Sequence, residues 1–172
     1  MDPVKLGQVT NSDVYIDGNQ IVGRVREFSI EGVTYEEVEH KALGMIGGVN
    51  LPGRTLEPMK ATIAFDWLDS EVMRKTARPN KVVTMQFQSF VDVFDQSGVN
   101  ASLGYRLITS VDLLFGSSTI DAFKHGENSG EELEASVLRL VITTSKTTVP
   151  IREISVADNI NRADGVDVWP TY

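Results

Sequence analysis

The sequence contains no cysteine and only two histidines, His40 and His125, which lie far apart in the chain. The absence of cysteine excludes disulfide bonds, thiolate metal sites and cysteine nucleophiles together. Two distant histidines give little support to a transition-metal site, because such a site needs several nitrogen or sulfur ligands. We therefore expect no metal centre and no disulfide framework.

Long apolar runs are also missing, since no stretch approaches the roughly 18–20 apolar residues that cross a bilayer. The first residues, MDPVKLGQVTNSDVY, lack the apolar core of a secretory signal. These absences predict a chain that folds in a cytoplasm and does not insert into a membrane. With 172 residues, 41% of them hydrophobic and 23% charged, the composition suits a single globular domain over residues 1–172.

Positive charge is scarce, with 16 Lys and Arg residues against 24 Asp and Glu residues and a net charge of −8. Direct nucleic-acid binding normally rests on a basic surface, so this balance disfavours it. Two interpretations of the acidic surface remain open. It keeps the protein soluble, or it lets a polyanion pass without sticking.

Catalytic motifs are absent as well: there is no GxSxG elbow, GxxxxGK[ST] loop, HExxH pair or EF-hand loop. The glycine-rich run LGMIGG at residues 43–48 lacks the Lys and Ser/Thr of a phosphate-binding loop. Glu37 and Glu39 share one face of a predicted strand, and a solvated acidic face explains them better than acid–base chemistry. We expect no enzyme and no bound cofactor.

What the sequence does have is repeated alternation of apolar and polar residues, the pattern of strands with one buried face. Three such segments are long and cover residues 58–66, 82–93 and 105–115. Strands of this length favour a barrel wall or a sandwich over a small hairpin module. Shorter strands are predicted on both sides of a turn at Asp17, Gly18 and Asn19, and over residues 33–42, 132–145 and 148–157. Pro150 cannot donate a ladder hydrogen bond, so it predicts that the last of these is an edge strand or is bulged.

One helix is predicted, over residues 67–77. Asp69 or Ser70 can cap its first turn, and Pro79 ends it. The expected fold is mainly β: an antiparallel barrel or sandwich with one covering helix.

Two segments do not suit a compact monomer. The first is a long loop expected at residues 40–54, which exposes apolar and glycine residues: Leu43, Gly44, Met45, Ile46, Gly47, Gly48, Val49 and Leu51. Such a loop is a lid, a binding loop or a segment that docks on a neighbour. The second is the arm at residues 158–172, which ends with Trp169 and Tyr172. A neighbouring subunit covers these aromatic residues, or the arm packs back on its own domain.

The order of these features resembles the major tail tube proteins of contractile-tailed bacteriophages, whose relatives include R-type bacteriocin tubes. The N-terminal similarity lies in the run VYIDGNQIVGRVREFSIEGVTYEEVEHKALGM, and the C-terminal one in EISVADNINRADGVDVW. The N-terminal positions that match the family pattern are Asp17, Gly18, Asn19, Gly23, Val25, Glu27, Glu36 and Glu37. Those of the C-terminal run are Ile154, Val156, Asp158, Asn159, Ile160, Gly165 and Asp167.

The resemblance implies a structural subunit that forms hexameric rings, stacked into a tube through which genomic DNA enters the host cell. It implies contacts with a tail sheath protein and with baseplate and tail-terminator proteins, and passing DNA that is not bound specifically. The subunit would be assembled in the bacterial host cytoplasm and end up in the tail of a virion. The loop at 40–54 and the arm with Trp169 and Tyr172 would then reach neighbouring subunits. Candidates for lumen-facing side chains are Glu37, Glu39, Thr62, Gln86 and Gln88.

Three alternatives stay open. The same fold can serve in an R-type bacteriocin or a secretion-like injection system. A monomeric β-barrel that binds a small ligand is a different class of function. A hydrolase with Glu37 or Glu39 as its acid is the third.

Overall fold

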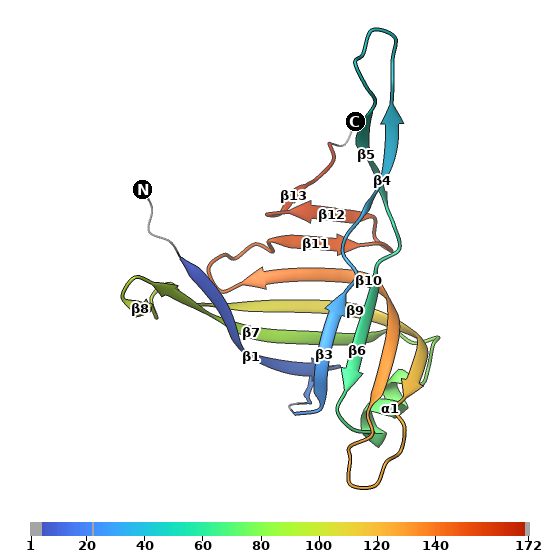
Figure 1. The fold of residues 1–172 in the computed structure, drawn as a ribbon, viewed down its shortest axis with the longest axis vertical. Helices are drawn as coiled ribbons and strands as arrows, with labels where there is room; N and C mark the ends of the chain where they lie inside the picture. Colours follow the sequence, from blue (N-terminus) through green and yellow to red (C-terminus); the bar gives the residue numbers. More distant parts are fainter. Residues whose placement is uncertain (1–4, 22, 171–172) are drawn as a thin grey trace.

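The computed structural model describes residues 5–21 and 23–170, which form thirteen strands and one helix (Figure 1). The strands are β1 (Leu6–Ile16), β2 (Asn19–Gln20), β3 (Val25–Ile30), β4 (Tyr35–His40), β5 (Val49–Leu56), β6 (Lys60–Phe65), β7 (Val83–Asp95), β8 (Gly98–Val99), β9 (Tyr105–Ile120), β10 (Glu131–Thr144), β11 (Arg152–Ser155), β12 (Ile160–Ala163) and β13 (Val166–Asp167), and the helix is α1 (Ser70–Thr76). Eleven strands belong to one sheet, and β4 and β5 form a separate pair.

The main path of the large sheet runs β13–β12–β11–β10–β9–β7–β1–β2, and all its pairs are antiparallel. The longest strands, β7, β9 and β10, lie next to one another in its centre. The alternation seen in the sequence places Met85, Leu113 and Leu133 on one face, where they are almost fully buried. The predicted antiparallel β fold with one helix is therefore confirmed.

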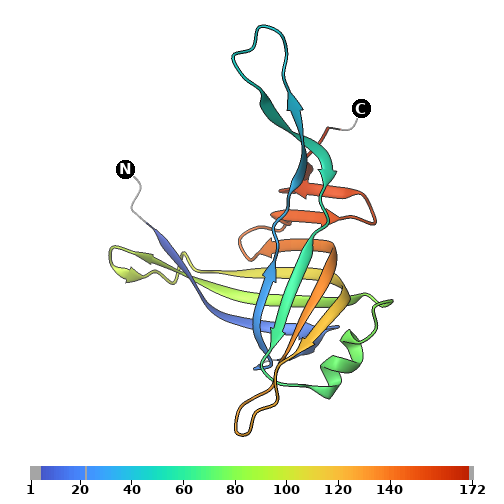
Figure 2. The same ribbon diagram turned by 45° about the vertical axis from the view of Figure 1, so that its right-hand side comes forward.

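One edge of β10 serves two partners and folds the sheet over itself. Its first residues, Glu131 to Ser136, pair with β6, whereas Arg139 to Ile142 pair with β11. Strand β6 also pairs with β3, so β3 and β6 form a second layer that crosses the long strands (Figure 2). The rings of Phe28 in β3 and Phe87 in β7 stack with their centroids 3.8 Å apart and close the core between the layers.

The helix α1 follows β6 and lies beside the ends of β9 and β10 (Figure 2). Asp69 caps it, because its Oδ1 accepts a hydrogen bond from the Glu71 backbone N–H at 2.8 Å. The other carboxylate oxygen of Asp69 pairs with the Arg24 guanidinium. Val72 and Thr76 are the buried residues of the helix. The expected cap and the covering role of this helix agree with the structure.

Three expectations differ from the structure. The segment at residues 40–54 is not one long loop, because Val49 to Arg54 lie in β5 and pair with β4. The strand after Pro150 is not at an edge, since β11 begins at Arg152 and pairs with both β10 and β12. The arm from residue 158 is not an extension alone, because it adds β12 and β13 to the large sheet. In each case, the strand pairs with a neighbour close in the sequence through a turn that the alternation pattern does not reveal.

The cap of α1 gives a test of how this helix is held. We expect Asp69→Ala to lower the free energy of unfolding by about 2 kcal/mol, because both the cap and the Arg24 pair are lost. Asp69→Asn keeps an acceptor for the Glu71 N–H and should cost less. Urea unfolding of both variants measures the difference. Equal losses would show that the Arg24 ion pair, rather than the cap, stabilises the helix.

Candidate assembly surfaces

The hairpin of β4 and β5 projects from the body of the molecule along its longest axis (Figures 1 and 2). At its tip, Leu43 and Ile46 are fully exposed, with relative exposures of 105% and 110%. Most other hairpin residues are exposed as well. A two-stranded hairpin is only marginally stable in water. An isolated hairpin with an apolar tip therefore has the features of a segment that docks on another surface.

The two faces of this hairpin differ in chemistry. Residues that stand opposite each other share a face, so Val38 lies with Leu51, and His40 with Val49. Glu37, Glu39 and Asn50 project from the other face, where Asn50 Nδ2 donates to Glu37 Oε2 at 2.9 Å. One side is therefore apolar and uncovered within the subunit, and the other is acidic. Glu37 and Glu39 share a face, as the alternation predicts.

The C-terminal arm contacts the base of the hairpin. These contacts, which join Asn161 and Trp169 to Tyr35 and Arg54, form a clasp. Asn161 Nδ2 of β12 donates to the Tyr35 hydroxyl at 2.9 Å, across 126 positions of sequence. The Trp169 ring meets Tyr35 edge-on, with centroids 6.1 Å apart, and the Arg54 guanidinium lies 5.8 Å from the Trp169 centroid. Trp169 is half-buried, and its Nε1 is enclosed without a hydrogen-bond partner among the described residues. Trp169 thus contacts its own chain, while Tyr172 lies outside the described residues.

Both ends of the large sheet leave strand edges open. Among the described residues, β13 pairs only with β12, and Leu6 to Asp13 of β1 pair only with β7. Near the β1 end, exposed apolar side chains gather where β1, β7 and β8 extend beyond the body: Leu6, Val9, Phe90 and Val99. An unpaired edge exposes backbone donors and acceptors to any strand that can add to it. The sheet can therefore be continued sideways by other subunits.

The outer face of the long strands is polar and internally hydrogen-bonded. Gln88 Nε2 donates to Gln86 Oε1 at 3.0 Å, and Gln86 Nε2 donates to Ser110 Oγ at 3.3 Å. Thr84 Oγ1 donates to Asp112 Oδ1 at 2.7 Å on the same face. Arg139 on β10 is paired with Glu153 at 3.2 Å. This face therefore carries amides, hydroxyls and carboxylates. Two of its arginines, Arg139 and Arg162, are paired with Glu153 and Asp167, and Arg106 is exposed near the start of β9.

The five residues expected to face a lumen are not brought together. Gln86 and Gln88 lie on the outer face of β7, whereas Thr62 lies on the outer face of β6, across the core. Glu37 and Glu39 lie on the hairpin. Because the two layers present opposite outer faces, only one of them can line a lumen.

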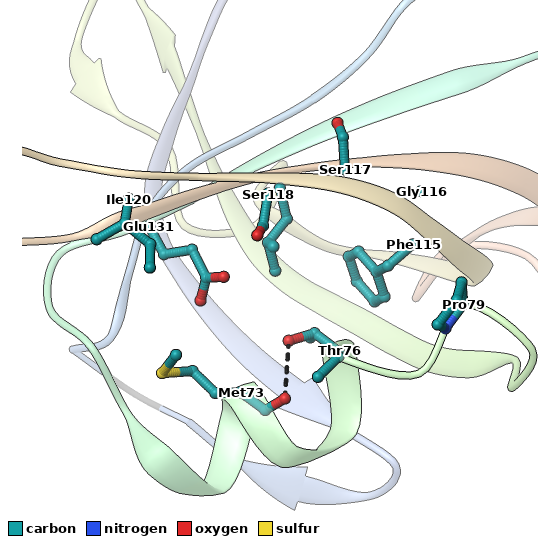
Figure 3. Close-up of a pocket in the computed structure, with 11 residues that line it drawn as sticks. Met73, Thr76, Pro79, Phe115, Gly116, Ser117, Ser118, Ile120 and Glu131 are labelled. Carbon is teal, nitrogen blue, oxygen red and sulfur yellow. Dashed lines mark hydrogen bonds between the residues drawn. The ribbon is translucent and has the colours of Figure 1, made fainter.

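Two cavities accompany these surfaces. One, of about 250 Å³, lies between α1 and the ends of β9 and β10, where the Glu131 side chain points into it (Figure 3). The other, of about 330 Å³, lies between β3 and the sheet near Phe28 and Phe87.

Over the described residues no cluster of three metal-ligating side chains occurs. No helix in the described part of the chain is long and apolar enough to span a membrane.

The comparison with protein families gives a match to the phage tail tube protein FII family over residues 7–172. The chain belongs to this family. Its members are structural tube proteins, so the chain is a structural subunit of a tail tube, part of a tail particle, and not an enzyme. The resemblance seen in the sequence is thereby confirmed. No curated protein sequence matches the chain.

Solved structures with a similar fold come from contractile injection systems. A chain of the PVC sheath/tube terminator in its extended state is 13% identical, with a TM-score of 0.50 over 83% of this chain and 98% of that chain. A chain of the PVC sheath–tube complex in its extended state is also 13% identical, with a TM-score of 0.48 over 77% and 87%. A chain of the anti-feeding prophage baseplate is 12% identical, with a TM-score of 0.44 over 77% and 90%. At these identities the first of the three shows a shared fold.

The sequence did not predict the contacts between the C-terminal arm and the base of the hairpin. Tyr35, Arg54 and Asn161 were not singled out, because their contacts with the arm join positions more than a hundred residues apart. The unusual terminal tryptophan was the only local signal of it.

The clasp predicts that Trp169→Ala loosens the base of the hairpin and leaves its tip unchanged. Trypsin should cleave faster after Arg54, which packs on the ring, and at an unchanged rate after Lys41 in the exposed tip. The free energy of unfolding should fall by about 1–2 kcal/mol, less than for a fully buried tryptophan. Val168→Ala, at an exposed neighbouring position, is the matched control. Unchanged cleavage after Arg54 would contradict the clasp.

Proposed function

We propose that the tube subunit assembles into closed rings that stack head to tail around a lumen, with the β4–β5 hairpin as the contact between rings. The observation that carries this proposal is the projecting hairpin, whose apolar face and tip have no cover within the subunit. Covering such a surface removes apolar area from water and offsets the weak stability of the hairpin. The tail tube family supports the same arrangement.

Within a ring, the open edges of the large sheet would join neighbouring subunits. The free edge of β1 and the edge at β13 lie at opposite ends of the sheet, so a contact between them is head-to-tail. Contacts of this kind close into rings when the rotation between subunits divides a full turn. We expect six subunits per ring. The exposed residues Leu6, Val9, Phe90 and Val99 would be covered in the same contact.

The face that lines the lumen would be the outer face of the long strands, with Gln86, Gln88 and Asp112. This face belongs to the sheet whose open edges are at β1 and β13, whereas the layer with Thr62 lies on the other side of the core. Arg139 on this face is neutralised by Glu153 and Arg162 by Asp167, so among its described arginines only Arg106, near the start of β9, is open to a phosphate backbone. Such a surface conducts DNA without binding it.

The proposed partners are a second copy of the chain, a tail sheath, a baseplate and a tube terminator. The fold shared with a chain of a sheath/tube terminator structure supports this set. A bacteriocin or another injection system would use the same subunit for a different cargo. Head genes beside this gene would distinguish a DNA-carrying virion from such a particle.

Negative-stain electron microscopy of the purified protein at high concentration tests the proposal. We expect rings or tubes with a central hole. Small monodisperse particles at every concentration would contradict it and would favour a monomeric ligand-binding barrel, which a ligand-dependent rise in Tm would then reveal.

Substitution of the tip separates assembly from folding. Leu43→Ser with Ile46→Ser should leave the Tm of the isolated subunit unchanged within about 1 °C, because both side chains are already in water. The same variant should form no stacked tubes in electron micrographs. Leu43→Met with Ile46→Val keeps an apolar tip and serves as the control. Normal tubes from the serine variant would show that the tip is not a ring contact.

A further inference from the structure

The end of the molecule opposite the hairpin carries a pocket into which the side chain of Glu131 points (Figures 1 and 3). We propose that this pocket, between α1 and the ends of β9 and β10, receives the hairpin tip of a second copy, and that Glu131 pairs there with Lys41 of that copy. This inference rests on the proposed stacking of rings and names the receiving site. The tip supplies residues 41–46.

The pocket is built as an apolar recess with one charge. Met73, Phe115, Ile120 and Leu133 line it, and its volume of about 250 Å³ is below the roughly 300–1,000 Å³ of typical small-molecule sites. A recess of this size suits one or two protruding side chains. The apolar lining comes from a helix and two strands that the rest of the fold holds in place.

Glu131 is the unusual member of this lining. It occupies a core-facing position of β10, in register with Phe65 and Ile120, and only 7% of the residue is exposed. Its side chain points into the pocket (Figure 3), and it has no hydrogen bond or ion pair from its side chain to any of the described residues. The residue is thus enclosed by its neighbours, while its carboxylate is open to the pocket and carries a negative charge there. A cation from outside the subunit would supply the missing partner.

The hairpin tip has the complementary chemistry. Leu43 and Ile46 project fully into water, and Lys41 precedes them in the same turn. Gly44 takes a φ of +89° there, a conformation that keeps the turn tight and that other residues adopt only under strain. Two exposed apolar side chains and one exposed lysine therefore lie within six residues of the tip. They match an apolar recess that contains one carboxylate.

The positions of tip and pocket decide how this contact propagates. They lie at opposite ends of the longest axis, so a subunit cannot fill its own pocket (Figure 1). A contact between two different surfaces of one chain is heterologous, and repeated along an axis it gives an open stack. Each subunit then offers one tip and one pocket. In the terminal ring of such a stack, either the tips or the pockets have no partner, and a different protein can occupy them.

Cysteine cross-linking tests the contact directly, because the chain has no cysteine of its own. The Ile46→Cys variant is mixed with Met73→Cys or Ile120→Cys, assembled and oxidised. A disulfide needs Cβ atoms within about 4.5 Å, so we expect covalent heterodimers from at least one of these mixtures. A mixture of Ile46→Cys with Val99→Cys, at the far end of β8, should give none. Tubes that form without a cross-link in either pocket mixture would overturn this inference and leave the proposed function standing. A wild-type protein that forms no tubes would overturn both.

The charge pair is tested by a double-substitution cycle on the assembling protein. We expect Glu131→Gln and Lys41→Gln each to raise the protein concentration needed for tube assembly about tenfold, and the combined variant to raise it no further. Glu131→Gln should leave the Tm of the isolated subunit unchanged within about 1 °C, because the carboxylate has no partner among the described residues of its own subunit. Glu132→Gln, whose exposed side chain points to the opposite face, is the control. An additive, hundredfold effect of the combined variant would show that the two residues do not pair.

Discussion

The shared edge of β10 is the constraint on which the rest of the structure depends. A strand has one row of donors and acceptors on each side, and β10 divides one of these rows between β6 and β11. Where the row passes from one partner to the other, the chain must split into two layers. The first layer folds over the core as β6 and β3, and the second continues flat as β11, β12 and β13. This division creates both the closed body and the sheet edge that other subunits can extend.

The same division explains why the hairpin stands free. Strands β4 and β5 are inserted between β3 and β6, which pair with each other, so the insertion leaves the body at the end of the folded-over layer. The clasp by Asn161 and Trp169 holds its base, and nothing in the described chain covers its apolar face. The subunit therefore has a closed core, while part of its apolar surface on the hairpin is left uncovered. Under the proposed assembly, other copies would cover its remaining apolar area.

The distribution of charge over the surface also affects assembly. The net charge of −8 arises from many carboxylates at the surface, while several cations are held in ion pairs, such as Arg24 with Asp69 and Arg139 with Glu153. A surface of this kind repels a passing polyanion. The same excess works against the close packing of like-charged subunits. Assembly must then rely on apolar contacts, backbone pairing and a few specific charge pairs rather than on general attraction.

The sequence by itself determined the long strands, the helix and the class of function. The long alternation over residues 82–93 and 105–115, the cap candidates Asp69 and Ser70 and the two family-like runs were sufficient, because these signals are local and the period of a strand is read from neighbouring residues. Only the tertiary structure decided that β5 pairs with β4, that β11 lies inside the sheet and that the C-terminal arm holds the hairpin. It also separated Thr62 from Gln86 and placed Glu131 in an apolar pocket. Each of these depends on which strands and side chains meet in space, and a pattern of alternating residues carries no information about that choice.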